Sequence, residues 1–301
     1  RSPWFDVDGA DEQQILLPTP GFRLRTKPHM SGGVAAIVPA AGTGSRIGGR
    51  RNKLWLPIAG EPLLAHTLRA LQASAAVRWI VVAVRPEDRV PVDALLRRCR
   101  ITKALPPVPG ASSRAESVAS AFGALPAGVT WVLIHDGARP CLTPALVSRA
   151  VGEAKRHGAV ACGVPASLTV KAADEEGWVR VTLDRERLWF VQTPQVFRRD
   201  WFGEALSRTG FGRTRGNGHA ARTLERFPDD AALMEAAGFA VRMIPGDPLN
   251  IKVTTREDFM LAEAILKTRA AREVKSQKEK VKTTRQKSKV NAGRLMLSRH
   301  F

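Results

Sequence analysis

The sequence has few cysteines, and they are not arranged in pairs. Cys99, Cys141 and Cys162 are the only three in 301 residues, and no Cys-x-x-Cys spacing occurs. A disulfide-stapled fold or a structural zinc site needs more numerous or closely spaced cysteines, so neither is indicated. We interpret the three residues as reduced thiols inside a folded domain.

Long apolar runs are also absent. A membrane helix needs about 18 consecutive apolar residues, whereas runs such as Trp79 to Val84 and Trp131 to Ile134 have the length of strands. The first thirty residues contain four acidic side chains and no apolar core, which argues against a secretory signal and an acid-poor transit peptide. The sequence therefore predicts no membrane partner and a cytoplasmic location.

Positive charge is in excess, with a formal net charge of +19 at pH 7. Residues 267–301 carry twelve Lys or Arg against two Glu, a net of +10, which leaves +9 on the rest of the chain. We predict that residues 268–301 form a basic, disordered tail. Nucleic-acid binding through this tail is a less favoured alternative, because no RNA-reading motif accompanies the charge.

Short apolar segments alternate with helical patterns from Val34 onward, which is typical of a mostly parallel sheet with helices on both faces. We predict an irregular leader over residues 1–32 and one α/β domain over residues 33–267. Within residues 165–189 the pattern changes to two alternating segments around an acidic turn that ends in Gly177. This change predicts a β-hairpin arm.

A loop of small residues follows the first predicted strand and reads Pro39-Ala-Ala-Gly-Thr-Gly-Ser-Arg46. Such a loop lets backbone N–H groups approach a phosphate closely. It lacks the third glycine of the dinucleotide fingerprint and the Lys-Ser/Thr of a P-loop, so a dehydrogenase and a P-loop ATPase are both disfavoured. Because Arg46 and Lys53 stand at the carboxyl end of this strand, where open α/β sheets bind ligands, we favour a phosphate site over an ordinary turn.

Asp136 follows the predicted strand Trp131 to Ile134 and is expected at the same sheet edge. A carboxylate there can bind a sugar hydroxyl or help to place Mg²⁺, and it can equally be an ordinary capping residue. We assign the adjacent His135 to packing or loop hydrogen bonding.

Five segments in order resemble the 2-C-methyl-D-erythritol 4-phosphate (MEP) cytidylyltransferases of the non-mevalonate isoprenoid pathway, over roughly Val34 to Leu266. Besides the small-residue loop they are Ile134-His-Asp-Gly-Ala-Arg-Pro140, Thr182-Leu-Asp-Arg185, Gln192-Thr-Pro-Gln195 and Asn250-Ile-Lys-Val-Thr254. The resemblance implies a Rossmann-like fold of the nucleotide-diphospho-sugar transferase type. It also implies transfer of the cytidylyl group of CTP to a sugar-alcohol phosphate, with Mg²⁺ as cofactor and release of pyrophosphate.

The resemblance also assigns roles to four cations. It implies that Arg46 and Lys53 hold the triphosphate and stabilise the charge that develops at the α-phosphorus, while Arg185 and Lys252 hold the acceptor's phosphate. Transfer of this kind depends mainly on positioning and charge stabilisation. The attacking phosphate is already an anion and needs no general base.

The remaining implied contacts surround these cations. The nucleotide is expected to contact Pro39, Ala40, Ala41, Gly42, Thr43, Gly44, Ser45, Gly110, Ala111, Ser117, Asp136, Gly137 and Ala138. The acceptor is expected to contact Asp136, Arg139, Thr169, Arg185, Thr193 and Lys252. The resemblance further implies a homodimer in which the arm crosses between subunits, so that Thr169 and Arg139 reach the neighbouring acceptor site.

The chain departs from the usual pattern of these enzymes at two places. Lys53 stands between Asn52 and Leu54 instead of in Pro-Lys-Gln, and Pro228 replaces a threonine before the acidic pair Asp229-Asp230. Loss of that hydroxyl leaves ribitol 5-phosphate as an alternative acceptor. The segment from Thr182 to Arg185, followed by Leu188-Trp189, favours the erythritol phosphate.

Overall fold

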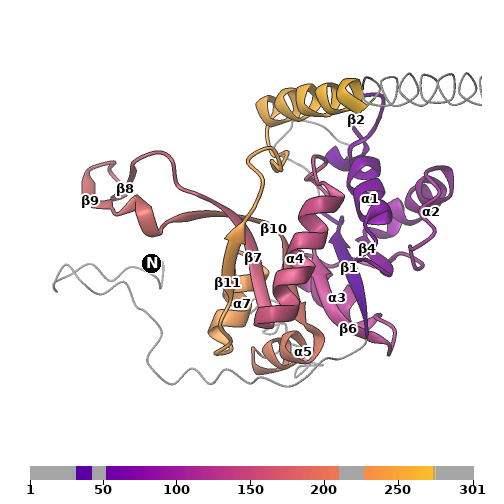
Figure 1. Ribbon diagram of the computed structural model, residues 1–301, viewed down its shortest axis with the longest axis horizontal. Helices are drawn as coiled ribbons and strands as arrows, with labels where there is room; N and C mark the ends of the chain where they lie inside the picture. Colours follow the sequence, from indigo (N-terminus) through magenta and orange to yellow (C-terminus); the bar gives the residue numbers. More distant parts are fainter. Residues whose placement is uncertain (1–31, 43–51, 210–226, 274, 276–301) are drawn as a thin grey trace, which may run out of the picture.

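The computed structural model describes residues 32–42, 52–209, 227–273 and 275, and it is built around one seven-stranded sheet (Figure 1). Across the sheet the strands are β11 (Arg242–Pro245), β7 (Ala159–Pro165), β10 (Trp189–Arg198), β6 (Val129–Ile134), β1 (Gly33–Pro39), β4 (Trp79–Val84) and β5 (Val108–Pro109). Only β10 runs antiparallel to its neighbours, β6 and β7. The predicted mostly parallel sheet is confirmed.

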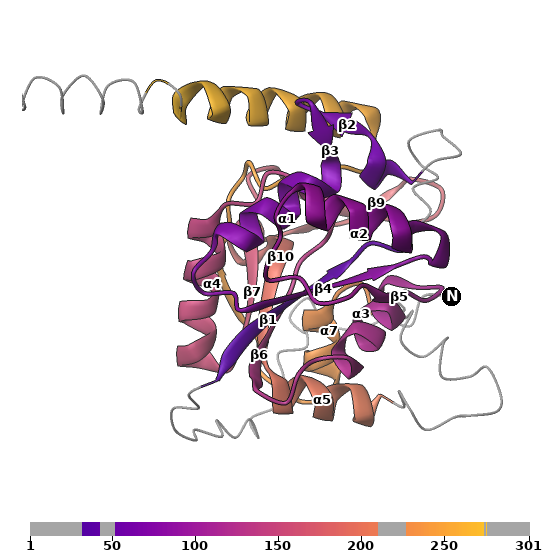
Figure 2. The ribbon, with the colours of Figure 1, turned by 90° about the vertical axis from the view of Figure 1, so that its right-hand side faces the viewer.

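Helices cover both faces of this sheet (Figure 2). One face is covered by α1 (Leu63–Ala73), α2 (Arg89–Arg98) and α4 (Pro144–His157). A helix over residues 256–273 joins the same core and lies across one end of the domain (Figure 1). The other face is covered by α3 (Arg114–Gly123), α5 (Arg199–Arg208) and α7 (Asp230–Ala236). Smaller elements are the strand pair β2 (Pro57–Ile58) and β3 (Glu61–Pro62) and the 3₁₀ turns η2 (Lys53–Trp55), η3 (Pro86–Asp88) and η4 (Arg185–Arg187).

Strand β1 lies in the middle of the sheet because its side chains are apolar on both faces. Val34, Ala36 and Val38 join the core under α1 and α4, whereas Ala35 and Ile37 join the core under α3 and α5. Alternate strand residues point to opposite faces, so a strand without polar positions must be covered twice. The loop that follows β1 is thereby anchored to a strand that is buried on both faces.

The helix α4, which was not predicted from the sequence, has clear local signals. Thr143 accepts a hydrogen bond from the backbone N–H of Leu146, and Pro144 begins the helix. Gly158 ends it with a φ of 85°, a conformation that favours glycine. A Cβ at Gly158 would also lie 2.3 Å from the ring of Trp201, so the packing of α5 against this turn needs glycine as well.

The predicted arm forms a two-stranded sheet that projects from the domain (Figure 1). Its strands are β8 (Val170–Ala173) and β9 (Val179–Leu183), which lie within the predicted residues 165–189 on either side of Gly177. Leu168, Trp178 and Val179 are 73%, 71% and 55% exposed. A hairpin with its apolar side chains in water is only marginally stable by itself.

The last helix passes the boundary predicted at Lys267. It continues to residue 273, and the Arg269 guanidinium donates to the carbonyl oxygen of Cys141 at 2.6 Å and pairs with Asp247 at 3.2 Å. The folded part therefore extends beyond 267, because one cation of the basic segment is used for packing. Residues 1–31 of the predicted leader, residue 274 and residues 276–301 lie outside the described residues. Among the helices the structure describes, none is both long and apolar enough to cross a membrane.

We expect Arg269→Ala to lower the free energy of unfolding by about 1–2 kcal/mol, because it removes two charge-assisted contacts. Arg272→Ala, on the exposed side of the same helix, should change it little. Urea denaturation of both variants measures the difference. Equal effects would show that Arg269 is not an anchor of the helix.

Candidate active site

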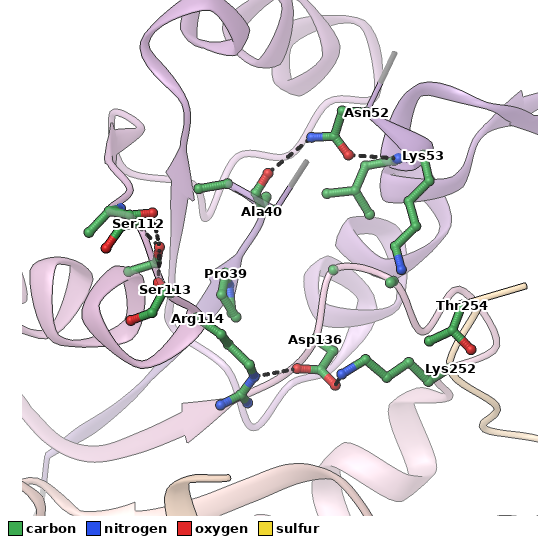
Figure 3. Close-up of a pocket in the computed structure, with 17 residues that line it drawn as sticks. Pro39, Ala40, Asn52, Lys53, Ser112, Ser113, Arg114, Asp136, Lys252 and Thr254 are labelled. Atoms are coloured by element: carbon green, nitrogen blue, oxygen red, sulfur yellow. Dashed lines mark hydrogen bonds and ion pairs between the residues drawn. The ribbon is translucent and has the colours of Figure 1, made fainter. Parts of the chain in front are cut away.

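A cavity of about 490 Å³ opens beside the carboxyl ends of β1, β5 and β6 (Figure 3). Its walls are the loop after β1, the turn η2, the N-terminal end of α3, the loop after β6 and the loop before the last helix. The lining residues are Pro39, Ala40, Ala41, Gly42, Asn52, Lys53, Leu54, Ala111, Ser112, Ser113, Arg114, Ser117, Asp136, Gly137, Ala138, Lys252 and Thr254.

The loop after β1 approaches the neighbouring loop very closely. The N–H of Ala40 donates to the carbonyl oxygen of Ala83, and that of Gly110 donates to Val84 at 2.7 Å. A Cβ at Gly110 would lie 2.3 Å from the Cβ of Ala41, so a larger residue could not stand there without moving one loop. Small residues thus bring the backbone of two loops to one wall of the cavity.

The N-terminal end of α3 forms the next wall. Ser113 accepts from the N–H of Glu116, whose carboxylate accepts from the N–H of Ser113, which is a capping box. The Ser117 hydroxyl accepts from the N–H of Ala111 at 3.0 Å and donates to the carbonyl oxygen of Ser113. Ser117 therefore fixes the loop to the helix, and the positive end of the helix dipole lies at the cavity, where it favours anions.

Asp136 is the electrostatic centre of the site. Its Oδ1 lies 2.8 Å from Nε of Arg114, and its Oδ2 lies 3.1 Å from Nζ of Lys252 and 3.4 Å from Nε of Arg139. Burial alone would raise the pKa of Asp136, but the charges of Arg114, Lys252 and Arg139 outweigh burial and hold this pKa far below its ordinary value. The carboxylate therefore stays ionised and holds Lys252 at the cavity.

Arg114 joins this centre to a second carboxylate. Its Nη2 lies 2.8 Å from Oδ2 of Asp230, the first residue of α7. Burial would lower the pKa of Arg114, but Asp230 and Asp136 outweigh it and raise the pKa. Asp136 and Asp230 are 6% and 3% exposed, so the guanidinium neutralises two buried charges and ties α7 to the cavity.

His135 and Thr193 support Asp136 from behind. The Thr193 hydroxyl accepts from the backbone N–H of Asp136 at 3.1 Å and lies 3.0 Å from Nδ1 of His135. Burial, with the charges of Arg139 and Arg114, lowers the pKa of His135 to about 3 even though Asp136 opposes the shift. A neutral histidine that accepts from Thr193 fits these contacts, and the prediction of a packing role agrees with them.

The chain is similar in sequence to a family of known enzymes. Residues 34–268 match the family described as 2-C-methyl-D-erythritol 4-phosphate cytidylyltransferase. The enzyme of that name from Pelotomaculum thermopropionicum is 41% identical over 79% of this chain and 96% of its own length. The one from Microcystis aeruginosa is 38% identical over 77% and 98%.

Solved structures agree with the sequence relatives. The crystal structure of the cytidylyltransferase from Thermus thermophilus aligns with a TM-score of 0.61 at 31% identity, over 77% of this chain and 98% of that one. The chain belongs to this family. It is a nucleotidyltransferase that transfers the cytidylyl group of CTP to MEP in isoprenoid biosynthesis.

Most of the residues expected around the nucleotide meet at the cavity. Lys53 and Lys252 line the same cavity from different loops (Figure 3). They are joined there by Pro39, Ala40, Ala41, Gly42, Ala111, Ser117, Asp136, Gly137 and Ala138. Gly110 stands directly behind Ala41. Thr43, Gly44, Ser45 and Arg46 lie outside the described residues.

The expected acceptor contacts are more dispersed. Thr169 and Arg185 are exposed on the arm, and Arg185 donates to the carbonyl oxygen of Ser167 instead of lining the cavity. Arg139 is only 8% exposed and is held inside its own chain by Asp136 and the carbonyl oxygen of Asn250. Within the single chain Arg139 contacts its own interior, and the expectation that it reaches a neighbouring acceptor site stays a prediction.

Sequence reasoning missed several lining residues, of which Arg114 is the most consequential. Its role depends on two carboxylates that are 22 and 116 positions away in the chain. No local pattern marks such a residue, although its place at the first position of a helix after Ser113 is a weak signal. The other lining residues that sequence reasoning missed are Asn52, Leu54, Ser112, Ser113 and Thr254.

We expect Arg114→Met to lower the free energy of unfolding by about 3–5 kcal/mol, because it leaves two buried carboxylates without their shared partner. Arg97→Met, an exposed substitution on α2, is the matched control and should have little effect. Chemical denaturation followed by circular dichroism measures both. A loss below about 1 kcal/mol for Arg114→Met would contradict the bridging role.

Proposed function

We propose that the cavity holds the triphosphate of CTP against the loop after β1, with the acceptor's phosphate beside Lys252. The observation that carries this assignment is the presence of Lys53 and Lys252 in one cavity with the small-residue loop and the N-terminal end of α3. All of these groups favour anions. The two substrates, CTP and MEP, are those of the family to which the chain belongs.

In the proposed reaction an oxygen of the MEP phosphate attacks the α-phosphorus of CTP. A new P–O bond forms, the bond to the β-phosphate oxygen breaks, and pyrophosphate leaves with the electron pair. Lys53 stabilises negative charge on the phosphates as it develops, and Lys252 orients the attacking phosphate. The attacking oxygen is already anionic, so no side chain has to remove a proton, which agrees with the low pKa of His135.

Asp136 fits this scheme as a positioning group. It keeps the Lys252 amine at the cavity edge, and its carboxylate can accept a hydrogen bond from a hydroxyl of either substrate. The loop that carries Lys252 is fixed at the same place, because the N–H of Val253 donates to the carbonyl oxygen of Ala138 at 2.8 Å. When the acceptor binds, its phosphate would replace the Asp136 carboxylate as the ion-pair partner of the Lys252 amine.

We also propose Mg²⁺ as the cofactor, but the described residues do not fit the expectation that Asp136 is its ligand. Both oxygens of this carboxylate already face cations, and the described residues contain no cluster of three metal-binding side chains. Mg²⁺ is commonly held by substrate phosphates and water, with few protein ligands. Bound to the phosphates of CTP, it would neutralise part of their charge.

A homodimer completes the proposed site. Arg185 and Thr169 lie on the exposed arm, outside the cavity of their own chain, and the arm exposes Leu168, Trp178 and Val179. A projecting hairpin with apolar side chains is stabilised by burial against another surface. We propose that the arm of one subunit brings Arg185 and Thr169 to the acceptor side of the other. A cytoplasmic location is proposed as well, supported by the three free thiols.

The first test measures pyrophosphate release from CTP and Mg²⁺ with MEP or ribitol 5-phosphate. We expect turnover with MEP and a loss of about 10²–10³ in kcat for Lys53→Ala, because a cation at the developing charge is removed. Lys252→Ala should mainly raise KM for MEP. Lys155→Ala, exposed on α4, serves as the control. Preference for ribitol 5-phosphate, or an unchanged Lys53→Ala, would overturn the proposal.

Subunit mixing tests the role of the arm. Lys53→Ala and Arg185→Ala proteins should each be nearly inactive. After they are unfolded together and refolded, half of the dimers should be mixed, and each of these should contain one intact site. About a quarter of the wild-type activity is then expected. No recovery, with mixed dimers present by native mass spectrometry, would show that Arg185 does not act across the interface.

A further inference from the structure

Lys53 is anchored by a buried polar network that starts outside the cavity. Asn52 is 2% exposed and is the N-cap residue of η2, where its side-chain oxygen accepts from the N–H of Leu54 at 3.1 Å. Its Nδ2 donates to the carbonyl oxygen of Ala40 at 3.2 Å (Figure 3). One side chain thus connects the turn that carries Lys53 to the loop after β1.

Asp88 fixes this asparagine from the far side. It lies at the end of η3, is 6% exposed and does not line the cavity. Its Oδ2 accepts from Nδ2 of Asn52 at 3.3 Å and from Nε of Arg85 at 2.9 Å, and its Oδ1 accepts from Nε1 of Trp55 at 2.8 Å. The carboxylate therefore contacts residues on both sides of Lys53 in the sequence.

The geometry points to Asp88 as a positioning residue for the cytidylyl transfer, acting through Asn52 on Lys53 and on the loop after β1. This inference rests on the proposed role of Lys53. Only an acceptor can stand at position 88, because Asn52, Trp55 and Arg85 all present N–H groups to it. With these donors satisfied, Asn52 is held with its oxygen toward Leu54 and its amide toward Ala40.

The inference also explains the unusual residue before Lys53. A proline at position 52 has a fixed φ but no side-chain donor or acceptor. Asn52 replaces that local constraint with three hydrogen bonds, and it needs an acceptor on another element to orient its amide. Asp88 is the group that supplies this acceptor, from a position 36 residues further along the chain.

The test is Asp88→Asn, which keeps the shape but places an amide donor against other donors. We expect kcat/KM for CTP to fall about tenfold, a typical coupling between contacting groups. Asn52→Ala should give a similar loss. The Asn52→Ala/Asp88→Asn double variant should be no worse than Asn52→Ala alone, since Asp88 acts through Asn52.

Two control variants separate positioning from general destabilisation. Glu87→Gln removes the neighbouring carboxylate, which also pairs with Arg85 but is 62% exposed, and it should leave kcat/KM unchanged. Val92→Ala, in the buried face of α2, should lower the melting temperature without lowering kcat/KM at 25 °C.

The outcomes are distinguishable. A tenfold loss for Asp88→Asn that disappears in the Asn52→Ala background supports the inference. An additive loss, or no loss, overturns it. A loss matched by Val92→Ala at equal melting temperature also overturns it, because stability alone would then explain the effect. A fully active Lys53→Ala would instead overturn the proposed function on which the inference rests.

Discussion

The Asp136 carboxylate is the interaction on which the rest of the site depends. Arg114, Arg139 and Lys252 come from a helix, a loop and a second loop that are distant in the sequence, and all three converge on its two oxygens. Gathering three cations beside an apolar core would be costly without an anion among them. The carboxylate makes their proximity favourable, and its backbone is fixed in turn by Thr193.

The three cations around Asp136 differ in the partners that they contact. Arg139 and Arg114 are committed to the protein itself, one through the carbonyl oxygen of Asn250 and the other through Asp230. Lys252 is the most exposed of the three, with 41% of its side chain accessible, and it lines the cavity. A half-exposed amine can exchange an internal carboxylate for a substrate phosphate at small cost, whereas the buried guanidiniums cannot.

The loop after β1 and the arm differ in how firmly they are attached to the core. The loop after β1 follows a strand that is buried on both faces, and it is tied to neighbouring elements by backbone hydrogen bonds and by Asn52. The arm, in contrast, has exposed apolar side chains and no part in either core cluster. The groups assigned to the nucleotide thus stand on the core, and those assigned to the acceptor are divided between the core and a projecting hairpin.

Local sequence patterns were sufficient for the alternation of strands and helices, the small-residue loop and the arm, because these depend on residues close together in the chain. Lys53 and Asp136 could also be found, since each follows a predicted strand at the same sheet edge, whereas Lys252 was assigned only by resemblance to the family. Pro144 and Gly158 could have indicated α4 by the same kind of reasoning.

Only the tertiary structure decided which charges neutralise each other: Arg114 joins Asp136 to Asp230, and Arg269 extends the fold past residue 267. Arg139 donates to the carbonyl oxygen of Asn250 in the interior of its own chain. The physical reason is that a charged side chain acquires its role from partners on other elements. The sequence determined which charged residues could lie at the sheet edge, and packing determined which partner each of them contacts.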